Sequence, residues 1–401
     1  MNRVKCQAEV HMGDNVPNEQ GVDFRLTDEL KMLRESARVF AEAEILPQVM
    51  KYDEAQEFPM AVFQKMAELG YLGVTVPIEL EGAGLSPMHF VVVMEELSRV
   101  DPSVGLTLAA HSGLCLQHLS LFGSDEQKRR YVPDLATGSK IGSWCLTEPG
   151  SGSDASGMKT ASVRDGDAYV ITGSKSFITN GSYASTYVVL AKTDLSKGSK
   201  GISAFIVERS MKGVGIGKKE NKLGMRASDT VTMAFDAVRV PKENLIGLEG
   251  DGLKQALTVL DGGRIGIAAL SVGLAQGALD AAVKYAKERQ AFGRPIAEFQ
   301  GIQFKLAEMA TEIQAARLLT YRAAMAKENG EPVNLIAAQA KLYASEVAQR
   351  VATEAVQTHG GYGFIKDFPV EKFYRDVKLL TIGEGTSEVQ KMVIAKNLLQ
   401  A

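Results

Sequence analysis

The sequence predicts an α+β multidomain fold, with an N-terminal all-α domain, a middle antiparallel β-barrel or β-sandwich domain, and a C-terminal four-helix bundle. Apolar residues recur near a 3.6-residue period from Thr27 to about Leu135, and again after Gly252. The stretch between them is rich in Ser, Thr, Gly and β-branched residues, and no helix of crossover length interrupts it. The 401 residues suffice for two or three domains.

The first helical domain is predicted to span residues 25–138. It follows a polar segment of mixed charge over residues 1–24, which we expect to be a loosely ordered extension. Thr27 and Asp28 are plausible caps of the first helix, because they stand just before its apolar periodicity begins. A Gly-containing break over residues 81–87 separates the later helical stretches.

The β domain is predicted to span residues 139–247. Asp165-Gly166 lies between two strand-like runs and predicts a hairpin turn. The short apolar run 187–191 predicts one strand, and the alternation of large apolar residues over 231–236 predicts a second, half-buried one.

The C-terminal domain is predicted to span residues 248–401. Four long amphipathic stretches with modest loops between them favour a helix bundle. The predicted helices cover about 253–289, 302–316, 335–357 and 387–399.

The composition excludes several classes of protein. The 45 Lys and Arg against 48 Asp and Glu give a net charge of −3, with no basic stripe that would predict a nucleic-acid partner. The three cysteines and five scattered histidines show no metal-ligand spacing, so no metal is expected. P-loop, dinucleotide-binding and nucleophile-elbow motifs are absent. No apolar run reaches about 18 residues, so we expect a soluble intracellular protein without a membrane span.

Two Gly-rich segments have a composition that suits ligand binding. The loop Trp144–Asp154 combines hydroxyl groups with glycines, so it offers donors and permits close approach of a planar or anionic ligand. Composition alone favours the other interpretation, a flexible polar turn. The segment Gln357–Gly363 ends a predicted helix, where glycines are expected of a C-cap and His359 suits a packed or capping role.

Glu384 stands between two glycines, just before the last predicted helix. One interpretation is a carboxylate on a loop that faces a cavity, since a general base for carbon acids needs a desolvated carboxylate with a raised pKa. The other is a solvated loop residue, with Thr386 or Ser387 as an ordinary N-cap.

Taken together and in order, five motifs resemble those of the acyl-CoA dehydrogenase family, over about Leu26 to Leu399. The resemblance is greatest to the short-chain (butyryl-CoA) dehydrogenases, with some segments similar to isovaleryl-CoA dehydrogenase. Any one motif is weak, but five at family-like spacings are specific. They are T-E-P-G-x-G-S-D at Thr147–Asp154, F-I-T-N-G at Phe177–Gly181, R-x-x-F-G at Arg289–Gly293, Q-x-x-G-G at Gln357–Gly361 and E-G-T-S-E at Glu384–Glu388.

The resemblance implies an FAD between the middle domain and the C-terminal bundle. Phe177 stands where many relatives have Trp, so the aromatic wall remains without the indole N–H. The residues expected at the flavin ring and ribityl chain are Trp144, Leu146, Thr147, Gly152, Ser153, Phe177, Ile178 and Thr179. Those expected to reach the FAD of a neighbouring subunit are Arg289, Phe292, Gln300, Gln357, Gly360 and Gly361, and those expected to close over the flavin are Thr386, Ser387 and Glu388.

The same resemblance implies a homo-oligomer, usually a tetramer, and makes Glu384 the catalytic base that removes the α-proton of an acyl-CoA thioester. The β-hydrogen would leave as hydride to flavin N5, and the electrons would pass to electron-transfer flavoprotein. The residues expected to contact the substrate are Ser153, Asp261, Arg264, Gly383 and Gly385. For Arg264, the alternative is a structural role as an ion-pair partner.

The acyl group is less closely defined. Isovaleryl-CoA dehydrogenase takes its base from the helix near Gly263, so with glycine there that base is absent. Glutaryl-CoA dehydrogenases have an Arg near Gly105 that binds the distal carboxylate, so Gly105 argues against a glutaryl group. Most relatives with this base have Tyr before it, where this chain has Gly383. We therefore expect a short straight, branched or alicyclic acyl group. The alternatives are a desulfinase-like, oxidase-like or hydroxylase-like reaction on the same fold. We expect the protein in a bacterial cytoplasm rather than in the mitochondrial matrix.

Overall fold

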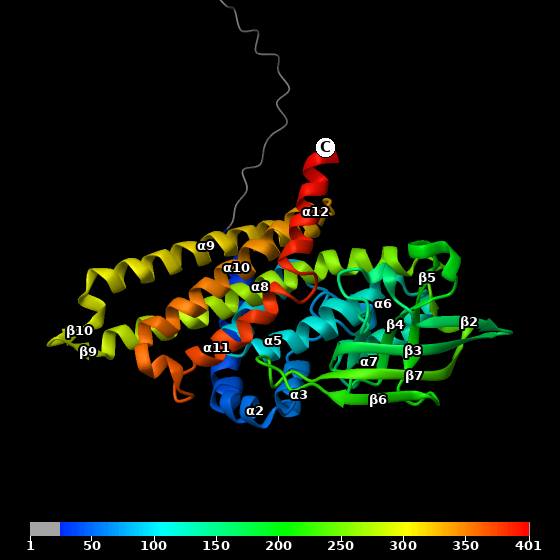
Figure 1. The fold of residues 1–401 in the computed structure, drawn as a ribbon, viewed down its shortest axis with the longest axis horizontal. Coiled ribbons are helices and arrows are strands. Elements are labelled where there is room, and N and C mark those ends of the chain that lie inside the picture. The colour runs from blue at the N-terminus through cyan, green and yellow to red at the C-terminus, as the bar shows by residue number, and fades with distance from the viewer. Residues whose placement is uncertain (1–24, 401) are drawn as a thin grey trace, which may run out of the picture.

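The computed structural model describes residues 25–400, in the predicted order of a helical, a β and a second helical region (Figure 1). The predicted extension over residues 1–24 lies outside the described residues. In the first region a π-helical stretch, Ala109–Leu116, joins α5 directly to α6. The helices are α1 (Asp28–Phe40), α2 (Val49–Ala55), α3 (Met60–Glu68), α4 (Pro87–Val100), α5 (Pro102–Leu108), α6 (Gln117–Phe122) and α7 (Asp125–Ala136).

Side-chain caps begin several of these helices. The hydroxyl of Thr27 accepts the N–H of Leu30 at 3.3 Å, which confirms the predicted N-cap of α1. Ser86 caps α4 in the same way, and the Asp101 carboxylate accepts the N–H of Ser103 at 2.9 Å at the start of α5. Each cap satisfies an N–H group that the first helical turn leaves without a partner.

The middle region forms one sheet in the order β6-β7-β3-β2-β4-β5-β8, with β1 beside β4. Strands β2 and β3 form the predicted hairpin, with Gly166 at φ +62° in its turn. The strands are β1 (Gly142–Cys145), β2 (Ala161–Asp165), β3 (Ala168–Thr179), β4 (Thr186–Lys192), β5 (Ile202–Glu208), β6 (Val214–Lys219), β7 (Thr230–Pro241) and β8 (Leu245–Ile246).

The sheet is mixed, whereas the sequence predicted antiparallel pairing throughout. Strand β1 runs parallel to β4, with Gly142 opposite Thr186, and Ala161 of β2 also pairs in parallel with Lys192 of β4. A parallel neighbour needs a long connection but not necessarily a helix. Here the β2–β3 hairpin lies within the connection from β1 to β4, so the lack of a crossover helix did not exclude parallel strands.

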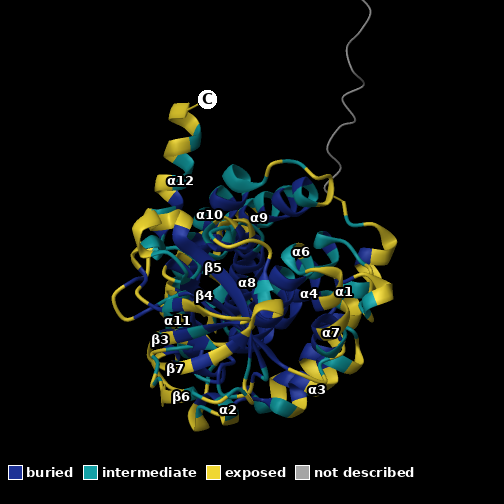
Figure 2. Ribbon diagram, turned by 90° about the vertical axis from the view of Figure 1, so that its right-hand side faces the viewer, coloured by how far each residue is buried: buried dark blue, intermediate teal, exposed yellow. Residues whose placement is uncertain are grey.

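The C-terminal region contains three long helices side by side, α8, α9 and α10 (Figure 1). Helix α4 packs against α8 and α9, which joins the two helical regions. Helix α12 packs against α10, and its outer end projects from the body of the protein (Figure 2). The sequence pattern did not indicate α11. The elements are α8 (Gly252–Glu288), the hairpin β9 (Gln290–Ala291) and β10 (Arg294–Pro295), α9 (Gln300–Glu328), α10 (Asn334–His359), α11 (Val370–Asp376) and α12 (Ser387–Gln400).

Helix α8 runs through the centre of the fold, where most of its residues are buried (Figure 2). By length and composition alone it could cross a membrane, but 83 % of its most apolar stretch is buried inside the protein. This burial is typical of a core helix. The middle domain and α10 both pack against α8, so the candidate site lies beside this helix.

Candidate active site

Glu384 lies in a tight turn before α12 with its backbone in the left-handed region, at φ +52°. A non-glycine residue there costs about 1–3 kcal/mol, so surrounding contacts must hold it. The carbonyl of Leu379 accepts the N–H of Gly383 at 2.7 Å. On the other side, Nε2 of Gln390 donates to the carbonyls of Glu384 at 3.3 Å and of Gly385 at 2.9 Å. The turn is therefore fixed from both ends.

The Glu384 carboxylate points at α8. A Cβ atom on Gly263 would overlap Oε2 of Glu384, so this glycine makes room for the carboxylate. Oε2 is buried, without a hydrogen-bond partner among the described residues. Burial raises the pKa of Glu384 to about 7, against the opposing charges of Lys341 and Arg264. The interpretation of Glu384 as a solvated loop residue is wrong, although Thr386 does cap α12 by accepting the N–H of Val389.

Arg264 is buried on the same helix as Gly263. Its Nη1 contacts Oδ1 of Asp261 at 2.5 Å, and Asn334 donates to the same oxygen at 2.9 Å. Burial lowers the pKa of Arg264, and its Nε is buried without a partner among the described residues. Arg264 therefore makes the structural ion pair and still has a donor for a ligand, so the two interpretations of this residue are compatible.

The loop predicted to contact a flavin is anchored at its base by a buried ion pair. Nζ of Lys175, on β3, donates to Oε1 of Glu148 at 2.8 Å and to the carbonyl of Leu146 at 3.0 Å. The Glu148 carboxylate also accepts the backbone N–H groups of Lys159 and Thr160, just before β2. Gly152 and Ser153 are exposed at its tip. The base of the loop is thus held firmly, while its tip is open to a ligand.

Phe177 presents its ring outward, with 67 % of the residue exposed and a backbone φ of +57°. It lies at an irregularity in the β3–β7 pairing, which turns the ring out of the sheet. An exposed aromatic ring on a strained backbone is a common feature of ligand-contacting positions. Trp144, Leu146 and Ile178 are buried, so they would reach a cofactor mainly through their backbone. Thr147 and Thr179 are half-buried beside them.

The second predicted set of cofactor residues lies at the other end of the long helices (Figure 1). Helix α8 has 37 residues, which corresponds to about 55 Å. Arg289 and Phe292 follow its C-terminal end, Gln300 begins α9, and residues 357–361 end α10. Phe292 is 96 % exposed at φ +52°. A single chain therefore does not bring the two predicted sets together.

An open groove of about 550 Å³ lies between the ends of α8 and α10. Tyr285 stacks on His359 with ring centroids 4.2 Å apart, and the Arg289 guanidinium lies 5.2 Å from the centroid of the Tyr362 ring. Aromatic faces next to a cation suit a planar anionic ligand. Gly360, at φ +58°, ends α10, which confirms the predicted C-cap. The other predicted residues in the groove are Gln357 and Gly361.

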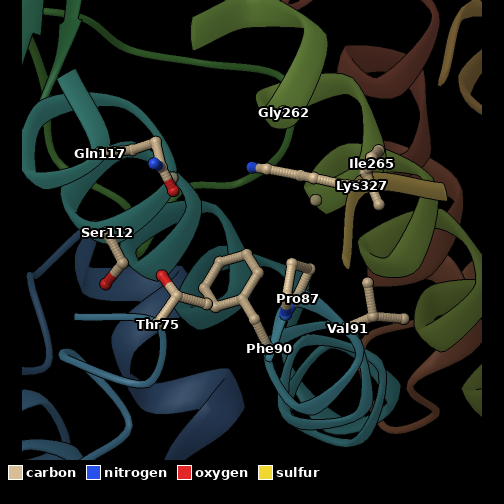
Figure 3. A pocket seen from close by; sticks show the side chains of 11 residues that line it. Thr75, Pro87, Phe90, Val91, Ser112, Gln117, Gly262, Ile265 and Lys327 are labelled. Carbon is tan, nitrogen blue, oxygen red and sulfur yellow. The ribbon is translucent and has the colours of Figure 1, made fainter. Parts of the chain in front are cut away.

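A smaller cavity of about 20 Å³ lies beside a different part of α8, at Gly262 to Gly266 (Figure 3). It is large enough for about one water molecule. The side chain of Lys327 reaches into it, next to Gly262, and burial lowers the pKa of this lysine. The opposite wall is formed by Phe90 and Ser112.

Comparisons with known proteins agree with this architecture. Three family models match consecutive parts of the chain: the acyl-CoA dehydrogenase N-terminal domain over residues 27–139, the middle domain over 143–238 and the C-terminal domain over 250–399. The short-chain specific acyl-CoA dehydrogenase of Clostridium acetobutylicum is 48 % identical, over 94 % of this chain and 100 % of that protein.

Two further relatives are similar over nearly their whole length. A subunit of the caffeyl-CoA reductase-Etf complex of Acetobacterium woodii is 45 % identical, over 93 % of this chain and 99 % of that subunit. The structure of butyryl-CoA dehydrogenase from Megasphaera elsdenii superimposes with a TM-score of 0.93 at 43 % identity, covering 94 % of this chain and 100 % of the other.

The chain belongs to the acyl-CoA dehydrogenase family. More particularly, it is an FAD-dependent oxidoreductase that dehydrogenates acyl-CoA, similar to the short-chain specific and butyryl-CoA dehydrogenases.

Sequence reasoning missed several residues that hold the site in place. Lys341 and Gln390 bind carbonyls of the turn that carries Glu384. Lys175 and Glu148 anchor the Gly-rich loop. Lys175 and Lys341 are fully buried, and no sequence pattern distinguishes a buried lysine from an exposed one. The sequence singled out Gly263 only because the isovaleryl-type base would stand near it, and its role of making room for Glu384 became visible in the structure.

Proposed function

We propose that this enzyme converts a short-chain acyl-CoA thioester to the 2-enoyl-CoA, with Glu384 as the base. The buried, unpaired carboxylate of Glu384, with its pKa of about 7, carries the proposal. A carboxylate in such surroundings is a much stronger base than one in water, so it is suited to take the α-proton at Oε2.

The backbone of Glu384 has a second role in the proposal. Its N–H donates to no acceptor within residues 25–400, so it can bind the thioester carbonyl oxygen where enolate charge develops. A donor of this kind stabilises the transition state by roughly 3–4 kcal/mol. In this proposal, the N–H and the carboxylate of one residue in a left-handed turn act on the same thioester. We place the remaining substrate contacts at Ser153, Asp261, Arg264 and Gly385.

A bound FAD would supply the redox chemistry, with its N5 as the acceptor for the β-hydrogen as hydride. The residues present fit this cofactor. The exposed ring of Phe177 and the open Gly152–Ser153 tip provide a wall and donors for a flavin, and the groove at Arg289 and Gly360 suits its adenine end. Thr386 to Glu388, at the start of α12, would cover the flavin.

The separation of the two predicted FAD-binding sets supports a homo-oligomer, which in this family would be a tetramer. Because the first set lies in the middle domain and the second follows the C-terminal end of α8, we infer that one FAD contacts both sets by lying between two chains. We place the enzyme in a bacterial cytoplasm with electron-transfer flavoprotein as acceptor, in keeping with the bacterial relatives and the Etf complex named above.

The acyl group is proposed to be short and straight, branched or alicyclic. A Cβ atom on Gly383 would meet the carbonyl of Leu379 at an ordinary 3.5 Å, so the backbone does not require glycine there. Its lack of a side chain therefore serves to leave space next to the base, which suits a substrate with substituents near the reacting carbons.

Anaerobic titration with acyl-CoA thioesters tests the proposal through the visible absorbance of the flavin. The panel contains butyryl, isobutyryl, 2-methylbutyryl, isovaleryl, glutaryl and cyclohexanecarboxyl thioesters. We expect one or two non-glutaryl members to bleach the wild type and none to bleach Glu384→Gln. A yellow protein that no thioester bleaches would contradict the proposal and favour desulfinase-like chemistry. Rapid reoxidation by air after bleaching would favour an oxidase.

A further inference from the structure

Lys341, in the first third of α10, binds the turn that carries the base. It is fully buried, and its Nζ donates to the carbonyl of Gly385 at 2.7 Å. An ammonium group loses its hydration when it is buried, so its place inside a helical core has a substantial cost. Burial lowers the pKa of Lys341 to about 8, and the charge of Glu384 opposes this shift.

The Gly385 carbonyl is the point where the geometry of the turn can be controlled. Glu384 and Gly385 are consecutive left-handed residues, at φ +52° and φ +91°. Lys341 and Gln390 both donate to the carbonyl of Gly385, from α10 and α12 respectively. Fixing that carbonyl fixes the peptide that follows the base, and with it the direction in which the Glu384 side chain leaves the backbone.

The charged groups around Glu384 come from every element that packs on the turn. Helix α8 contributes Arg264 and Asp261, which pair with each other, and α9 contributes Lys327. Helix α10 contributes Lys341 and Glu346, and α12 contributes the exposed Glu388. Arg264 shares its charge with Asp261, and Glu346 accepts the Ser387 hydroxyl at 2.6 Å. Of the two cations whose charges act on the Glu384 carboxylate, Arg264 pairs with Asp261, whereas Lys341 has no carboxylate within 4.0 Å among the described residues.

We propose that Lys341 is a positioning residue for the base: its ammonium holds the turn through the Gly385 carbonyl and keeps the Glu384 carboxylate ionised near neutral pH. This inference rests on the proposed role of Glu384. It assigns two separable effects to one side chain, a hydrogen bond that sets the position of the base and a charge that sets its ionisation. Gln390 shares the first effect but not the second, since it is neutral.

The test measures ionisation and catalysis separately, on the flavin-loaded holoenzyme. The carboxylic-acid C=O stretching band of Glu384, assigned by its absence from Glu384→Gln, is titrated against pH by infrared difference spectroscopy. The rate of flavin reduction by the best thioester is measured over the same pH range. The variants are Lys341→Met, Lys341→Gln, Lys341→Arg and Gln390→Leu. Lys140→Met, which breaks a surface ion pair with Asp134, is the control.

We expect Lys341→Met to raise the midpoint of the infrared titration and to slow flavin reduction at pH 7 by on the order of 10²-fold, because a displaced base loses this much rate. Lys341→Gln should raise the midpoint similarly with a smaller loss of rate. Lys341→Arg should restore the wild-type midpoint, and Gln390→Leu should slow reduction at an unchanged midpoint. Lys140→Met should behave as wild type.

A wild-type midpoint and rate in Lys341→Met would overturn the proposal and leave Lys341 a packing residue. If Lys341→Met fails to fold, Lys341→Gln decides, and an unchanged midpoint there overturns the proposed effect of charge. Failure of the function proposed above is distinguishable, because the wild type would then fail to bleach with any thioester while the infrared band could still be titrated.

Discussion

At the scale of single residues, backbone strain coincides with the proposed site. Phe177, Phe292 and Glu384 all adopt left-handed backbone angles that L-residues usually avoid. Two of them expose an aromatic ring, and the third buries an unpaired carboxylate oxygen. Each conformation costs about 1–3 kcal/mol, so the chain keeps it only where neighbouring contacts outweigh the strain. The sequence motifs indicated these positions, but the strain itself is visible only in three dimensions.

The buried base should make the enzyme less stable at alkaline pH. The pKa of Glu384 is raised from 4.5 to about 7, so its ionised form is penalised in the folded state. Below pH 4.5 the carboxyl group is neutral in both the folded and the unfolded protein, so burial costs the folded state little. The free energy of unfolding then falls as the pH rises from 4.5 through 7, because the unfolded state loses this proton first. We expect Glu384→Gln to be more stable than the wild type at pH 8, by up to about 3 kcal/mol. Thermal melts at pH 5 and pH 8 check this, and an equal difference at both would contradict it.

Gly263 should be needed for catalysis more than for stability. A Cβ atom there would displace the Glu384 carboxylate, which can swing away at little cost in folding free energy. We expect Gly263→Ala to slow flavin reduction on the order of 10²-fold with a small change in melting temperature. Gly266→Ala, where the added Cβ would meet only Phe90 at 3.5 Å, is the control. Equal rates in the two variants would refute this role.

At the scale of elements, the sequence predicted more about helices than about the sheet. Helix α8 was predicted from 253 to 289 and spans Gly252–Glu288, because its apolar periodicity is continuous. The parallel pairing of β1 with β4 was missed, since strand partners depend on contacts distant in sequence. Helix α9 extends well beyond its predicted end at Ala316, to Glu328. The anchoring of the Gly-rich loop through Lys175 was equally inaccessible, because lysine is normally expected at the surface.

The Lys175–Glu148 pair should hold the flavin-binding loop. Removing one partner leaves the other charge buried and unpaired, which typically costs about 3–5 kcal/mol. We expect Lys175→Met to lower the melting temperature and the flavin content of the purified protein. The double variant Lys175→Met/Glu148→Gln should recover part of the stability, because no unpaired charge then remains. Calorimetry and flavin absorbance measure both effects, and additive losses in the double variant would contradict this account.

At the scale of the whole molecule, the two predicted sets of cofactor residues lie in separate parts of the chain's fold. The motifs predicted both sets of residues, and the fold shows the first set in the middle domain and the second beyond the C-terminal end of α8, near β9 and β10 (Figure 1). The exposed apolar residues of α12, among them Met392 and Leu399, also suit contact with other chains. Both features support the proposed oligomer.

Complementation between chains should follow from this separation. We expect Phe177→Asp and Arg289→Glu each to lower flavin content when expressed alone. Co-expression should restore a fraction of the sites, because a mixed pair of chains contains one site with both halves intact. Differently tagged chains purified together allow flavin content and activity to be measured. No recovery in mixed oligomers would mean that each site is built within one chain.

The most direct measurement of the central claim is rapid-mixing flavin reduction by the best thioester as a function of pH, in the wild type and Glu384→Gln. We predict that the rate in the wild type rises with pH through a midpoint near 7, as Glu384 becomes ionised. Glu384→Gln should still bind the thioester but lose this reduction at every pH. Reduction of Glu384→Gln at the wild-type rate would show that another group removes the α-proton.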